Sequence, residues 1–135
     1  MVRFIDSNVF IYHIDRNPAF GEVSKAILQR VENGEEAITS TLVMEEVIIH
    51  VEQEYSPRDI PTVIRSILSY TSLRIVPYTI DDMLRAGEIL ENTNFSVDWD
   101  DAVIATVMER LGIREIYSND HHFDKISSLK RIFEQ

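Results

Sequence analysis

Short apolar runs alternate along the chain with longer segments in which apolar residues recur at helical spacing. The runs at 2–5, 37–39, 73–77 and 115–118 have the length of buried strands, and 130–133 is typical of an edge strand. Helical spacing covers 9–13, 20–31, 42–54, 59–70, 80–91 and 98–111. Strands that alternate with helices predict an α/β fold, a three-layer α/β/α sandwich around a parallel sheet of four to five strands.

Local signals mark where several of these helices begin and end. Ser7 and Asn8 are possible cap residues for the first helix, and Thr79 and Asp98 for the last two. Gly112 closes the last helix. No repeat, low-complexity tract or linker interrupts the pattern, so we expect a single domain over residues 1–135.

The composition narrows the class of protein. The chain has no cysteine, which excludes a disulfide framework, thiolate zinc sites and cysteine nucleophiles. No signal peptide is recognisable, and no apolar run approaches the roughly 20 residues that a membrane span requires. We therefore expect a cytoplasmic protein without a membrane partner.

The charge balance bears on possible partners. With 13 basic and 23 acidic residues, the formal net charge is −10. Since phosphate backbones attract basic surfaces, this balance argues against avid, non-specific nucleic-acid binding. A local basic rim remains compatible with it, and bound cations would cancel charge where the acids are densest. The candidates for such a rim are Arg3, Arg16, Arg85 and Lys125.

Three aspartates stand at a strand end or a helix start, near where parallel α/β folds bind their ligands. Asp6 ends the first strand and Asp120 lies just past the fourth, although an aspartate there is also a common turn residue. Asp101 shares a helix face with Ile104 and Met108, where an acid is costly unless it is paired or bound to a metal.

The acids next to these three fit capping or surface roles, or stay ambiguous. Asp98 is the better N-cap of its helix, and Asp100 falls off the apolar face, so we expect it in solvent. Glu45 and Glu46 lie on opposite flanks of the apolar face of their helix. Periodicity does not choose between these two glutamates.

Four acids in such places point to metal chemistry. Hard divalent cations take oxygen ligands, and clustered carboxylates repel one another unless a cation neutralises them. One or two Mg²⁺ or Mn²⁺ ions could activate a water and stabilise the leaving oxygen in phosphodiester cleavage. The pattern therefore favours a metal-dependent hydrolase.

Four segments carry the acids in contexts that look like one known family. The segments are FIDSNVF at 4–10, TSTLVMEEV at 39–47, DDAVIA at 100–105 and YSNDHHF at 117–123. They resemble the PIN-domain family, in the family's order and over essentially the whole chain. The resemblance implies a parallel α/β/α sandwich that binds Mg²⁺ or Mn²⁺ and cuts RNA. It is strongest to VapC-type toxins, which implies a ribonuclease of a type II toxin–antitoxin pair that forms a homodimer and binds a small antitoxin protein.

The resemblance also assigns individual residues. Polar residues match those that support the first and last acids, namely Ser7, Asn8, Ser118 and Asn119. Further acids are possible auxiliaries, namely Asp98, Asp100 and Asp124. The catalytic, metal-binding acids of the family match Asp6, Glu46, Asp101 and Asp120, with Glu45 as the rival of Glu46.

The chain departs from the family pattern in the acids beside Asp101 and in the pair His121-His122. Imidazole suits transition metals, so a histidine beside Asp120 would bias the site toward Mn²⁺. Loop histidines are more often exposed residues that bind nothing. The sequence does not say which histidine, if either, faces the site.

Three other functions compete with a toxin nuclease. A phosphatase or a phosphotransfer receiver would use Asp6 as nucleophile. However, Asp6-Ser7-Asn8 is neither the Asp-x-Asp of such a phosphatase nor the acidic pair of a receiver, and the mid-chain acceptor aspartate and later strand-end lysine of a receiver are missing too. A PIN nuclease of RNA processing would need no antitoxin. A metal-binding adaptor would keep the fold and cut nothing.

Two neighbouring helices are more apolar than one core-facing stripe requires. Residues 42–51 carry apolar side chains around most of the helix, and residues 60–68 add five more. Such helices are either covered by the rest of the chain or meet a partner. We expect a homodimer through part of this pair, including Ile49 and Ile64, and a groove for an apolar peptide.

Overall fold

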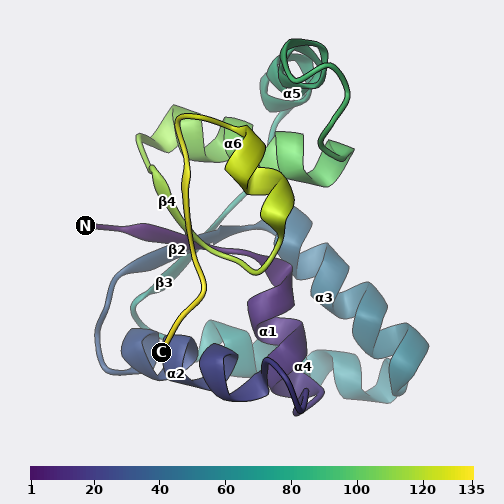
Figure 1. Ribbon diagram of the computed structural model, residues 1–135. Helices are drawn as coiled ribbons and strands as arrows, with labels where there is room; N and C mark the ends of the chain where they lie inside the picture. Colours follow the sequence, from purple (N-terminus) through teal and green to yellow (C-terminus); the bar gives the residue numbers. More distant parts are fainter.

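A five-stranded parallel sheet forms the centre of the computed structural model, which describes residues 1–135 (Figure 1). All four pairings are parallel, in the order β3-β2-β1-β4-β5. This confirms the predicted α/β sandwich and its strand count. The strands are β1 (Arg3–Ile5), β2 (Ala37–Ser40), β3 (Leu73–Val76), β4 (Glu115–Tyr117) and β5 (Lys130–Ile132).

Helices cover both faces of this sheet. Figure 1 shows α1, α2 and α4 on one side and α5 and α6 on the other, and α3 packs against α1 and α4. The chain moves from β1 outward to β3 and then returns to β4 on the other side of β1. Because each crossover connection is right-handed, the helices of the connections from β1 toward β3 lie on one face. The helices of the connection that returns toward β4 lie on the opposite face. The helices are α1 (Ser7–Ile14), α2 (Gly21–Glu32), α3 (Thr41–Glu54), α4 (Ile60–Leu68), α5 (Ile80–Asn92) and α6 (Trp99–Leu111), with short 3₁₀ helices η1 (Pro57–Asp59) and η2 (His121–Lys125).

The helix α6 lies between two apolar clusters. Ile104, Val107 and Met108 belong to the main core around the central strands. Ala102 and Val103 belong to a second cluster with α5. Every residue of α6 from 101 to 108 is therefore buried, although a single core-facing stripe would bury only part of a helix. None of the helices has the length and apolar content to span a membrane.

Helix starts follow the capping signals with one correction. Thr79 forms a capping box with Asp82 at the start of α5, and Gly112 ends α6 with φ +69°. Ser7 and Asn8, however, are helical residues and not caps. The N-cap of α1 is Asp6, whose side chain accepts the Ser7 backbone N–H, because the chain turns into the helix directly from β1.

Candidate metal centre

The pairing of β1 with β4 positions Asp6 at the carboxyl edge of the sheet. The Asp6 backbone N–H donates to the Tyr117 carbonyl at 3.0 Å, which brings Asp6 beside Ser118. The carboxylate of Asp6 accepts from Ser118 Oγ at 2.6 Å, Asn8 Nδ2 at 3.0 Å and the Ser7 backbone N–H at 2.8 Å. Three donors thus hold one buried carboxylate in a single orientation.

The helix α3 brings Glu46 to the same edge. It begins directly after β2, with Ser40 as N-cap, and Glu46 lies in its second turn. Glu46 is partly buried, and its Oε1 atom is buried without a hydrogen-bond partner. Glu45 is exposed. The structure therefore turns Glu46, and not Glu45, toward the other acids.

The start of α6 contributes Asp101 and, unexpectedly, Asp100. Asp101 is 2 % exposed, and its Oδ2 accepts the Asp98 backbone N–H at 3.4 Å. Asp100 is only partly exposed, and after burial it is the neighbour that most raises the pKa of Glu46. The prediction that Asp100 lies in solvent is wrong, because a residue off the apolar face of α6 still meets the side chain of another helix.

Asp120 joins the cluster from the loop after β4. Its backbone N–H donates to Ser118 Oγ at 2.9 Å, so one hydroxyl connects Asp6 and Asp120. The Asp120 carboxylate accepts the His122 backbone N–H at 2.9 Å. The Asn119 backbone N–H donates to Asn8 Oδ1 at 3.2 Å. Asn8, Ser118 and Asn119, which the sequence analysis named as supporting residues, therefore fix the loop after β4 against β1 and α1.

Crowding and burial disfavour the charged forms of these acids. Burial raises the pKa of Asp6 to about 6, against the hydrogen bond from Ser118 that lowers it. Burial and the neighbouring Asp100 raise the pKa of Glu46 to about 9. Burial and Asp100 also raise the pKa of Asp101 to about 7. A bound cation would offset the cost of ionising these groups, which is largest for Glu46.

The donor set fits a hard divalent cation. Glu46 Oε1 is a buried acceptor with nothing to accept from, which is costly unless a cation or proton occupies the site. The electrostatic neighbours that raise the pKa of Glu46 include Asp6 and Asp101, and Asp120 raises that of Asp6. The four predicted ligands thus come together from four separate elements. Carboxylate oxygens are the ligands that Mg²⁺ and Mn²⁺ prefer.

Other charged residues that the sequence suggested lie elsewhere or are engaged. Asp124 pairs with Arg131, outside the cluster. Arg3 pairs with Glu35 at the amino end of β1, away from the acids, and Arg85 pairs with Glu109. Arg3 is therefore not part of the predicted rim, because it lies at the opposite end of β1 from Asp6.

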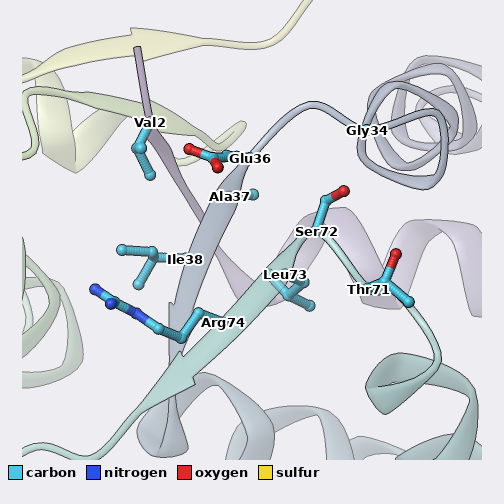
Figure 2. Close-up of a pocket in the computed structure, with 9 residues that line it drawn as sticks. All are labelled: Val2, Gly34, Glu36, Ala37, Ile38, Thr71, Ser72, Leu73 and Arg74. Atoms are coloured by element: carbon cyan, nitrogen blue, oxygen red, sulfur yellow. The ribbon is translucent and has the colours of Figure 1, made fainter.

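The most evident cavities do not coincide with the acids. One of about 420 Å³ opens at the amino ends of β2 and β3, and Figure 2 shows Ile38, Leu73 and Arg74 around it. Its single acid is Glu36. Parallel α/β folds bind ligands at the opposite edge of the sheet, where the carboxylates lie.

Comparison with known proteins identifies the family. A family model of the PIN domain matches residues 3–129, so the chain belongs to the PIN-domain family. Among curated proteins, none matches the sequence.

Solved structures of toxin–antitoxin proteins share the fold. VapC20 of Mycobacterium tuberculosis, a sarcin–ricin loop cleaving toxin, superposes with a TM-score of 0.77 at 20% identity over 93% of this chain and 95% of that one. VapBC2 from Rickettsia felis, bound to promoter DNA, has a TM-score of 0.76 at 18% identity, with 100% of both chains covered. DNA-bound VapBC from Salmonella typhimurium has a TM-score of 0.73 at 21% identity over 98% of each chain. At these identities the likeness establishes the fold.

Proposed function

We propose that this protein is a metal-dependent endoribonuclease and the toxin of a type II toxin–antitoxin pair, acting as one nuclease domain over residues 1–135. The observation that carries the proposal is the convergence of Asp6, Glu46, Asp101 and Asp120, with raised pKa values and an unpartnered Glu46 oxygen. Membership of the PIN family and the fold shared with VapC20 support it.

The acids would hold one or two Mg²⁺ or Mn²⁺ ions. Bound there, such ions activate an attacking water and stabilise charge on the scissile phosphate. Asp6 would be the most rigid ligand, because Ser118, Asn8 and Ser7 all donate to it. Ser118 would hold Asp6 and the Asp120 loop at a constant separation, since its hydroxyl contacts both.

RNA is the proposed substrate, in a single-stranded or loop region that can be splayed into a shallow site. A chain with a net charge of −10 gains little from non-specific attraction to RNA. The cations at the acid cluster would therefore supply much of the attraction for the phosphate. RNA as substrate also agrees with the expected cytoplasmic location.

The direct test is cleavage of structured RNA with Mg²⁺ or Mn²⁺, without metal, and by Asp6→Asn. We expect cleavage only with metal and native Asp6, leaving 5′-phosphate and 3′-hydroxyl ends. Cyclic phosphate ends would indicate attack by the ribose 2′-hydroxyl and contradict the proposed hydrolysis. Metal binding without any cleavage across varied RNAs would favour the adaptor alternative.

The proposed partners are an antitoxin and a second copy of the chain. Large apolar side chains are exposed on α3 and α4, with Ile49 51% and Leu68 60% accessible. An apolar antitoxin segment could cover part of this surface and a homodimer another part. Co-purification with the product of the adjacent upstream gene tests the first. A nuclease that keeps full activity with that product present would instead support a role in RNA processing.

A further inference from the structure

His122 lies closer to the acid cluster than the sequence indicated. Its backbone N–H is anchored on the Asp120 carboxylate at 2.9 Å. Its ring Nδ1 lies 3.0 Å from Asp101 Oδ2, 3.5 Å from Asp120 Oδ1 and 3.7 Å from Asp98 Oδ2. One imidazole nitrogen therefore faces three carboxylates that come from two different segments.

The neighbouring His121 has a different environment. Its side chain is 75% exposed and its Nδ1 contacts Asp124 and Arg131, at 3.2 and 3.1 Å. None of these three residues belongs to the cluster around Asp101. The structure thus separates two adjacent histidines into one that faces the acids and one that faces solvent.

We propose that His122 is a nitrogen ligand, through Nδ1, of a divalent cation held by Asp101, and that it makes the site favour Mn²⁺ over Mg²⁺. The inference rests on the proposed metal-dependent function. Mg²⁺ binds oxygen ligands almost exclusively and keeps several waters, whereas imidazole suits transition metals. A carboxylate site with one imidazole should therefore discriminate between two cations that an all-oxygen site would treat more alike.

The spacing of the donor atoms suits one cation. One ligand atom each from Asp98, Asp101 and His122 lie within 4.8 Å of one another. Two atoms that each lie about 2.1 Å from the same ion are at most about 4.2 Å apart. The largest separation must therefore shorten by about 0.6 Å at most. Asp98 can supply it, because its side chain is 74% exposed, whereas the side chain of Asp101 is 3% exposed.

A structural alternative gives His122 no contact with metal. In that alternative a protonated imidazole bridges Asp101 and Asp120 as an ion pair. The two alternatives differ in what the cation touches, which can be measured directly. In the first, the nitrogen is bonded to the ion; in the second, the bound ion has only oxygen neighbours.

Pulsed electron paramagnetic resonance of Mn²⁺ bound to the purified protein decides between them. We expect nitrogen hyperfine coupling in the wild type and in the matched control His121→Gln, and none in His122→Gln. Calorimetric titration should show that the preference for Mn²⁺ over Mg²⁺ falls about tenfold or more in His122→Gln alone. Circular dichroism in EDTA checks that each variant is folded.

Absence of nitrogen coupling in the wild type with Mn²⁺ bound would overturn the proposal without any variant. An unchanged Mn²⁺ preference in folded His122→Gln would do the same. RNA cleavage is a separate readout. Nitrogen coupling without cleavage would refute the nuclease and leave the ligand assignment intact, whereas metal-dependent cleavage without coupling would refute only the ligand assignment. Failure to bind either cation would overturn both.

Discussion

Ser118 and Asp6, which are 112 positions apart in the chain, are joined by a 2.6 Å hydrogen bond from the Ser118 hydroxyl to the Asp6 carboxylate. The same hydroxyl accepts the Asp120 backbone N–H at 2.9 Å. Ser118 is fully buried, so water does not replace either bond. One small side chain thus sets the relative positions of the first and last acids of the cluster.

Removing this hydroxyl should weaken metal binding. In Ser118→Ala we expect Mn²⁺ affinity to fall roughly 10–100-fold, because residues that orient metal ligands have effects of this size. Ser24→Ala is a matched control. Ser24 is also fully buried, but its hydroxyl has no partner, so its loss should leave affinity unchanged. Calorimetric titration of both variants checks this; equal affinities would mean that Ser118 orients no ligand.

A divalent cation should stabilise the folded protein. At ten times Kd, Mg²⁺ or Mn²⁺ should raise the free energy of unfolding by about 1.4 kcal/mol, since only the folded chain assembles the acids. Asp120→Asn should reduce this gain. Asp124→Asn, which changes a nearby acid that pairs with Arg131 instead, should not. Denaturant titrations with and without metal give the comparison, and a stability independent of metal in the wild type would count against a preformed site.

Without metal, Glu46 should make stability fall as pH rises. The pKa of Glu46 is about 9 in the folded protein, against an ordinary value of 4.5 for a glutamate in water. Between these values the folded state binds more protons than the unfolded state, so the free energy of unfolding decreases with increasing pH. The stabilising effect of protonating Glu46 in the folded state is fully present below pH 4.5 and is lost as the pH rises through about 9. The raised pKa values of Asp6, Asp101 and His122 act in the same direction.

Glu46→Gln should therefore gain stability relative to the wild type as the pH rises from 5 to 8 in EDTA. Glu45→Gln removes an equal charge at the neighbouring position, where the side chain is exposed. The difference in unfolding free energy between this variant and the wild type should stay constant. Urea denaturation midpoints at several pH values measure both differences. Parallel pH curves for the wild type and Glu46→Gln would show that Glu46 does not carry a raised pKa.

The proposed dimer should depend on exposed side chains of α3 and α4. Ile49→Glu and Leu68→Glu should each shift the protein toward the monomer in light scattering at micromolar concentration, with unchanged circular dichroism. Ile80, 75% exposed on α5, is the control position for Glu substitution. Ile64, which the sequence also suggested, packs against the main core, so a polar residue there should lower stability instead. Dissociation by Ile80→Glu alone would place the interface on α5.

The sequence by itself determined the order of strands and helices and most of their ends. Apolar spacing depends only on neighbours along the chain, and so do local capping signals such as Thr79 and Gly112. A parallel sheet then follows from alternation, and its carboxyl edge is where the acids after β1 and β4 must lie. The resemblance of the segments at 4–10 and 117–123 to the PIN-domain family pointed independently to Asp6 and Asp120.

Only the tertiary structure decided which side chains meet across the cluster. Spacing along a helix defines a direction around its own axis, but not which element that direction faces. The packing of α3 near the start of α6 therefore decides that Glu46, and not Glu45, joins the cluster. The same packing brings Asp100 close to Glu46. His122 was chosen over His121 by the anchoring of η2 on Asp120, a contact that no pattern of neighbouring residues encodes.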